Sequence, residues 1–232
     1  MPGIANILSS HLHRDDGTQS GLWLVKSIDN ALLENNDDRH SSEVFHPSSL
    51  GNPCDRYLYL HYHGLLPVKQ IDPQLRRIFD HGNATEGRYR KYFEKMKVLV
   101  GQEVRARLDN PPISGRADFQ LFFQQYGHVL IELKTINDTN FKKLTEPQPE
   151  HRVQLQVYLN ILNIDIGIVL YENKNNQAIK SFQLKKDLEM WGDILERCRL
   201  IQAMSFCPLL SSIKPGHDKY CMCLMVKDKL DI

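Results

Sequence analysis

The chain has 232 residues, of which 41% are hydrophobic and 25% are charged. This is the composition of a globular protein that can bury its own core, and it excludes a fibrous, collagen-like or wholly disordered chain. The net charge of +1 argues against a strongly basic nucleic-acid coat protein, but it leaves room for a local basic cleft. Charges interrupt the apolar stretches and the first residues lack a secretory signal, so we expect a cytoplasmic protein with no membrane partner.

The first part of the chain is predicted to be helical. Apolar residues recur at helical spacing over 22–33, and the polar stretch 34–43 predicts a flexible loop. A serine after Pro47 indicates a helix start, and Gly64 indicates the end of that segment. The longest helical pattern covers residues 74–97.

The pattern then changes from helical to alternating, which is typical of strands. Strands are predicted at 102–108, 114–123, 128–135, 166–171 and 179–184, and helices at about 149–163 and 186–204. This order predicts an α/β core with a central mixed sheet flanked by helices. We expect an N-terminal helix and loop in 1–44, the core in 45–205, and a cysteine-rich segment in 206–232 that packs back on the region of Cys54.

Two acidic residues are predicted to face each other across a hairpin. Glu132 and Lys134 are two residues apart, so they share one face of their strand. If Phe123 pairs with Gly127 at the turn, Asp118 lies directly opposite Glu132, with Cβ atoms roughly 4.5–5.5 Å apart. A shift of this register by one residue would place the two acids on opposite faces.

Facing carboxylates repel each other unless a cation binds between them. Mg²⁺ and Mn²⁺ prefer oxygen ligands, and Mg²⁺ keeps water molecules that a phosphate substrate can replace. Lys134 beside them would polarise a water molecule or stabilise charge that develops on a phosphate. An exposed strand with an ordinary salt bridge also explains a lone Glu-X-Lys. The Gly-X-X-Asp that ends at Asp118 makes the pattern more specific.

The combination of Asp118 with Glu132, Leu133 and Lys134 resembles the motif of the PD-(D/E)XK nucleases. This resemblance implies a restriction-endonuclease-like core. It also implies that Asp118, Glu132 and the carbonyl oxygen of Leu133 hold Mg²⁺ or Mn²⁺. Lys134 would then orient or deprotonate the water that attacks the phosphodiester.

Two further motifs are similar to the RecB-like branch of that superfamily. Gln154 and Tyr158 form Gln-X-X-X-Tyr on one face of a predicted helix, and in that branch the motif helps to place the DNA and the lysine. The stretch from Gly82 to Glu86 resembles the first motif, whose last residue supplies another metal ligand. Arg88 follows on the same helix, and a contact with DNA phosphate and an ordinary solvated position explain it equally well.

The cysteines extend the resemblance. Cys54-Asp-Arg56 and the tyrosine that follows resemble the Cys-X-Arg-X-X-Tyr element of iron–sulfur RecB-like nucleases, which include the CRISPR-associated and AddB-type exonucleases. In those proteins one early cysteine joins three C-terminal ones around a [4Fe–4S] cluster, because thiolates are its usual ligands. The resemblance implies this role for Cys54, Cys207, Cys221 and Cys223. A contact with DNA phosphate and an ordinary solvated position explain Arg56 equally well, as they do Arg88.

Two alternatives to an iron–sulfur cluster remain open at this point, a zinc site and C-terminal cysteines that bind no metal. In the zinc site, the cysteines and His217 would bind Zn²⁺. Cys198 shares a predicted helix with Leu195 and Ile201, so we expect it in the core rather than at a metal.

The resemblance implies a metal-dependent DNA nuclease, an exonuclease that acts on single-stranded DNA or duplex ends. Recombination, repair, or phage and mobile-element genome processing would be its setting, with proteins of such complexes as partners. One alternative is a nuclease fold that has lost activity and serves as a DNA-binding scaffold. Another is a structure- or site-specific endonuclease, although no recognition domain is visible after residue 205.

Overall fold

The computed structural model describes residues 21–33, 43–67, 71–210 and 221–226. The chain divides into two compact units, of which one holds 1–38 and 69–81, and the other 39–68 and 82–232. None of the described helices is long and apolar enough to cross a membrane.

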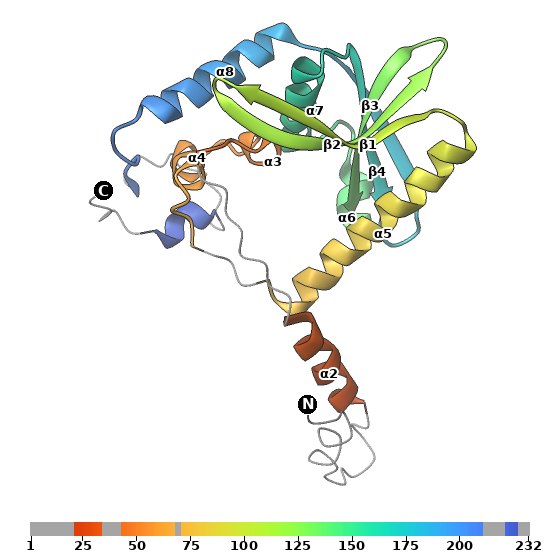
Figure 1. Ribbon diagram of the computed structural model, residues 1–232. Helices are drawn as coiled ribbons and strands as arrows, with labels where there is room; N and C mark the ends of the chain where they lie inside the picture. Colours follow the sequence, from red (N-terminus) through yellow and green to blue (C-terminus); the bar gives the residue numbers. More distant parts are fainter. Residues whose placement is uncertain (1–20, 34–42, 68–70, 211–220, 227–232) are drawn as a thin grey trace, which may run out of the picture. The chain divides into compact units, whose positions relative to one another are not determined.

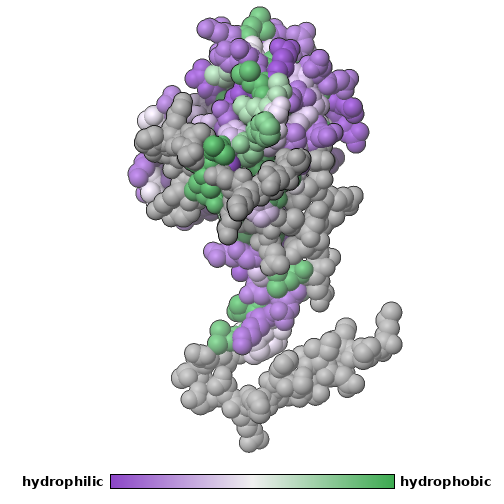
Figure 2. Space-filling view, turned by 90° about the vertical axis from the view of Figure 1, so that its left-hand side faces the viewer, coloured by the Kyte–Doolittle hydropathy of each residue, from purple (hydrophilic) through white to green (hydrophobic). Residues whose placement is uncertain are grey.

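The first unit contains the predicted N-terminal helix. This helix, α2 (Leu22–Leu33), and the beginning of α5 (Pro73–Lys95) are joined by an ion pair of 2.6 Å between Asp29 and Arg77. The apolar side chains of α2 lie at the surface, and Trp23 is 58% exposed. Figure 2 shows apolar residues of this unit at the surface beside polar ones.

A five-stranded mixed sheet forms the centre of the second unit (Figure 1). Its strands, in spatial as in chain order, are β1 (Leu99–Asp109), β2 (Pro112–Phe123), β3 (Gly127–Ile136), β4 (Ile166–Asn173) and β5 (Ile179–Lys185). Strands β3 and β4 run parallel, and the other neighbours are antiparallel. The predicted α/β class is confirmed, and the sheet with its helices is the expected restriction-endonuclease-like core.

The hairpin of β2 and β3 has the predicted register. Phe123 pairs with Gly127, whose φ of +69° is a left-handed conformation that glycine adopts without strain. The pairing then continues along both strands as far as Phe119 and Ile131. Because side chains alternate along a strand, this register decides which residues of β2 and β3 can meet.

Helices cover both faces of the sheet. Besides α5, the described part of this unit contains the helices α3 (Pro47–Leu50), α4 (Asp55–Tyr62), α6 (Asp138–Lys143), α7 (Pro149–Ile161), α8 (Leu188–Ala203) and the 3₁₀ helix η2 (Met222–Met225). Helix α7 packs Leu155 against Leu130 of β3, while α5 packs Phe93 against Ile131 on the opposite face. Strand β3 is therefore buried on both sides, which explains its nearly continuous apolar sequence.

A third apolar cluster is built by α3, α4, α8 and η2. Cys198 and Ile201 of α8 are buried there together with Cys223 of η2, as expected for Cys198. Gly51 at the end of α3 allows the close approach of α7, because a Cβ atom at this position would lie 2.4 Å from the Cα of Glu150.

The structure corrects one predicted helix. The segment from Pro47 to Gly64 is two short helices, α3 and α4, and the chain between them contains Pro53, which disfavours helical backbone at the residue before it. Cys54 then caps α4, since its sulfur accepts the N–H of Tyr57 at 3.2 Å. The predicted loop at 34–43 lies outside the described residues except for its last residue.

Candidate active site

Asp118 lies where the backbone pairing of β2 and β3 ends. The last paired residues are Phe119 and Ile131, one step before Asp118 and Glu132 would meet. There the carboxylate of Asp118 accepts a hydrogen bond of 2.7 Å from the N–H of Leu133. The side chain of Asp118 thus takes the place of the next backbone hydrogen bond between β2 and β3. Asp118 therefore lies next to the predicted Glu-X-Lys segment.

Glu132 is a buried carboxylate with an unusual shortage of hydrogen bonds. Its side chain is 1% exposed and lies 2.7 Å from the ammonium group of Lys134. Apart from this ion pair, no hydrogen bond from the described residues reaches either carboxylate oxygen. Buried charges normally have several partners, so the oxygen atoms of Glu132 have free capacity to bind a cation.

Burial and mutual repulsion raise the pKa values of three neighbouring acids. Burial, and then the charge of Asp118, raises the pKa of Glu132 to about 8. The same two causes raise the pKa of Glu86 to about 7, and burial raises the pKa of Asp118. Burial lowers the pKa of Lys134, but attraction to the three acids outweighs it, so the pKa lies above its usual value. The cluster favours an additional positive charge.

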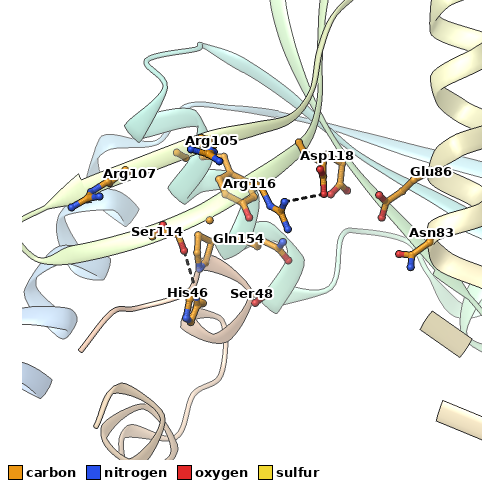
Figure 3. Close-up of a pocket in the computed structure, with 15 residues that line it drawn as sticks. His46, Ser48, Asn83, Glu86, Arg105, Arg107, Ser114, Arg116, Asp118 and Gln154 are labelled. Carbon is orange, nitrogen blue, oxygen red and sulfur yellow. Dashed lines mark hydrogen bonds and ion pairs between the residues drawn. The ribbon is translucent and has the colours of Figure 1, made fainter. Parts of the chain in front are cut away.

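Glu86 reaches this cluster from α5 across a cavity of about 680 Å³. Asn83 and Glu86 lie on the same side of α5, and both line the cavity opposite Asp118 of β2 (Figure 3). Glu132 and Lys134 are not part of the lining, but Leu133 between them donates its N–H to Asp118, which is. The three predicted metal-binding acids are therefore brought together from one helix and two strands.

Gln154 and Tyr158 of α7 are buried side chains that line the same cavity. A hydrogen bond joins the two side chains, and burial followed by the charge of Glu132 raises the pKa of the Tyr158 hydroxyl. Tyr158 is thus a neutral hydroxyl group at the pH of a cell. Gly115 on β2 leaves space beside it, because a Cβ atom there would lie 3.1 Å from the Tyr158 oxygen and 2.7 Å from Pro47.

Arg88, a predicted DNA contact, is engaged within the protein. Its guanidinium donates to Glu172 of β4 at 2.6 Å, and the Glu172 side chain is only 3% exposed. The hydroxyl of Tyr89 also bonds to Glu172. This arrangement fixes α5 to the sheet two residues after Glu86.

Arg56, the other predicted DNA contact, is also engaged within the protein. The residue is 3% exposed, and its guanidinium donates to the backbone carbonyls of Pro208, Cys223 and Val226. It also donates to the sulfur of Cys207 at 3.4 Å. This buried guanidinium ties α4 to the C-terminal segment.

Three of the four predicted cluster cysteines lie together. The sulfur atoms of Cys54, Cys221 and Cys223 all lie within 4.8 Å of one another, and those of Cys54 and Cys223 are 3.6 Å apart. Burial raises the pKa values of the Cys54 and Cys223 thiols. Cys207 lies outside this group of three, although it is held against the same segment by Arg56. His217 lies outside the described residues.

Several residues of the cavity were missed by the sequence reasoning. They are His46 and Ser48 at the start of α3, Glu103, Arg105 and Arg107 on β1, and Ser114 and Arg116 on β2. Glu103 has a φ of +50°, which is strained for a residue other than glycine, and its carboxylate lies 3.3 Å from the guanidinium of Arg116. The signal in the sequence was the spacing of Glu103, Arg105 and Arg107, since every second residue shares one face of a strand.

Comparison with known proteins identifies a shared fold. No protein-family model matches the sequence, and no curated protein matches it. The crystal structure of SSO0001 is 16% identical and matches 89% of this chain and 95% of its own, with a TM-score of 0.56. At this identity the likeness supports the fold alone.

Two exonuclease structures are similar at lower scores. LHK-Exo, an alkaline exonuclease from Laribacter hongkongensis that has also been solved in complex with dAMP, is 14% identical and matches 77% of this chain and 91% of its own, with a TM-score of 0.48. A phage-related exonuclease from Haemophilus somnus 129PT is 14% identical and matches 71% of this chain and 93% of its own, with a TM-score of 0.46.

Proposed function

We propose that the protein is a metal-dependent DNA nuclease of the PD-(D/E)XK type, and that it is an exonuclease. The observation that carries this proposal is the buried Glu132, whose carboxylate has Lys134 as its ion-pair partner and lies beside Asp118 and Glu86. Such a cluster costs stability unless it binds a cation, and a purely structural protein has no use for it.

The residues fit Mg²⁺ or Mn²⁺. Glu86, Asp118, Glu132 and the carbonyl oxygen of Leu133 would hold it, since hard cations take oxygen ligands. When bound, the ion supplies a water of lowered pKa and neutralises charge on the phosphate. Lys134 then stabilises the phosphate or holds a proton of the attacking water.

The two polar residues of α7 position the substrate in this proposal. Gln154 and Tyr158 line the cavity that Asp118 and Glu86 share, so they can donate hydrogen bonds to a strand that enters it. Because the Tyr158 hydroxyl stays neutral, it remains a hydrogen-bond donor at every pH at which the enzyme would work.

We also propose a structural metal centre at the cysteines. Cys54, Cys207, Cys221 and Cys223 would hold a [4Fe–4S] cluster, as the RecB-like resemblance implies. Zinc is the second candidate, and the 3.6 Å between two of the sulfurs favours it, because tetrahedral Zn–S bonds of about 2.3 Å place two sulfurs about 3.8 Å apart. Either group would fasten α4 to the C-terminal segment.

The test is digestion of end-labelled single- and double-stranded DNA with Mg²⁺, Mn²⁺ or EDTA. We expect progressive shortening with metal, none with EDTA, and a loss of at least about a hundredfold for Lys134→Ala and Asp118→Asn. Lys91→Ala, an exposed position on α5, is the control and should cut normally.

Each other outcome has a definite meaning. Discrete fragments instead of shortening would indicate an endonuclease. DNA binding without cleavage under any metal would indicate the inactive scaffold. Cleavage that survives in both variants, with thermal unfolding showing that they are folded, would contradict the assignment of the site.

A further inference from the structure

Positively charged side chains on β1 and β2 lie next to the acidic end of the cavity. Arg105 pairs with Arg116 in the register of these strands, and Arg107 pairs with Ser114. Asp118 follows Arg116 by two residues on β2. One face of the hairpin therefore changes from acidic to basic over two successive residue pairs.

The arginines belong to the same cavity as the acids. Arg105, Arg107 and Arg116 line it together with Asp118 and Glu86, and Figure 3 shows them following one another along the two strands away from α5. The cavity thus has one end suited to a metal ion and another suited to an anion.

These positive charges are not used to hold the fold. Among the described residues, no side-chain hydrogen bond or ion pair involves the guanidinium of Arg105, which is exposed. The ion pairs of Arg107 with Asp109 and of Arg116 with Glu103 join side chains that are more than half exposed. Such surface pairs contribute little to stability, so a stronger anionic ligand can replace the acids.

We propose that Arg105 and Arg116 bind the phosphate next to the one that is cleaved, and that Arg107 binds the phosphate after it. This proposal rests on the proposed nuclease function and adds the path of the DNA strand. A guanidinium binds phosphate through paired N–H groups, and strand residues two apart are roughly 6.8 Å from each other, which suits successive phosphates. Contacts with phosphate carry no sequence information, so cleavage is independent of sequence.

The arginines are positioning residues, since they do not touch the reacting phosphate. Contacts made equally in the ground state and the transition state lower KM and leave kcat unchanged. Each phosphate contact also releases counterions, which makes the affinity for single-stranded DNA depend on salt with a slope of about 0.7 per contact. A purely structural role would alter neither KM alone nor this slope.

The experiment compares Arg105→Gln and Arg107→Gln with Arg90→Gln, an exposed arginine of α5 that pairs with Glu94. Affinity for labelled single-stranded DNA is measured by fluorescence anisotropy at several salt concentrations, with Ca²⁺ in place of Mg²⁺. We expect Kd and KM to rise about five- to tenfold for the two cavity variants, the salt slope to fall by about 0.7, and kcat to stay within about threefold. Strands ending in phosphate or hydroxyl distinguish a terminal phosphate from an internal one.

A change in Kd and salt slope no larger than that of Arg90→Gln would overturn the proposal, and so would a loss of kcat with unchanged KM. A protein that binds DNA through these arginines but never cuts would contradict the nuclease function while leaving the phosphate path standing. A wild-type protein without measurable DNA binding would contradict both.

Discussion

At the scale of residues, the site depends on carboxylates that resist ionisation. The pKa of Glu86 lies at about 7 and that of Glu132 at about 8, because burial and neighbouring charge penalise the ionised forms. A metal ion must displace the protons that these groups hold. The protein therefore couples the binding of metal to pH more steeply than exposed carboxylates would.

We predict that Mg²⁺ stabilises the fold more at pH 8.5 than at pH 6. Without metal, the folded state holds protons on Glu86 and Glu132 that an unfolded chain releases near pH 4.5. The free energy of unfolding should therefore fall as the pH rises from about 4.5 through 7 and 8. Bound metal removes this loss of stability, because it takes the place of the protons on the two acids. Thermal unfolding with Mg²⁺ and with EDTA across this range measures both curves.

The control for this prediction is Glu86→Gln, which removes one of the titrating ligands. It should weaken the Mg²⁺ effect at pH 8.5 and flatten the metal-free curve between pH 4.5 and 7. A rise in melting temperature with Mg²⁺ that is equal at both pH values in the wild type would show that these acids do not bind the ion.

At the scale of elements, the sequence predicted the sheet better than the helices around it. The register of the β2–β3 hairpin followed from the two-residue period and the turn at Gly127, both of which are local. The break between α3 and α4 was missed, and the role of Arg56 could not be predicted. Its partners Pro208 and Val226 are more than 150 residues away in the chain, and no periodic pattern reveals such a contact.

The packing of α5 against β4 provides the second prediction. Arg88→Ala leaves the carboxylate of Glu172 buried without its charged partner, and we expect a loss of about 1–3 kcal/mol in the free energy of unfolding. The acid Glu86 lies two residues away on α5, so more Mg²⁺ should be needed for half-maximal cleavage. Denaturant unfolding and a Mg²⁺ titration of activity measure the two effects.

Two variants separate the ion pair from a general effect on α5. Arg90→Ala, whose ion pair is exposed, should change stability by no more than about 0.5 kcal/mol. The double change Arg88→Ala with Glu172→Gln should regain part of the loss, because it removes the buried charge. If the double variant is as unstable as the sum of both single changes, the pair is not the cause.

At the scale of the whole molecule, the cysteines connect parts of the chain that are far apart in sequence. Cys54 and Cys223 are separated by 169 residues, yet their sulfur atoms are 3.6 Å apart. The proximity of these cysteines could be predicted only from the resemblance to the iron–sulfur RecB-like nucleases. Cysteine spacing alone does not fix which cysteines are brought together. A metal that joins them would restrain a long stretch of chain, and its binding energy would become folding energy.

We predict that the protein purified without air contains iron and is brown, because a [4Fe–4S] cluster absorbs visible light. Cys223→Ser should lower the metal content and reduce the melting temperature by several degrees, because one ligand and its link across the chain are lost. Cys198→Ala removes a buried thiol outside the group, and it should keep its metal whatever it costs in packing. A colourless protein with zinc would replace the iron–sulfur cluster by the zinc centre that the short distance between sulfurs favours. A metal-free protein whose melting temperature is unchanged by Cys223→Ser would rule out both, and the buried thiols of α4 and η2 would then serve the core alone.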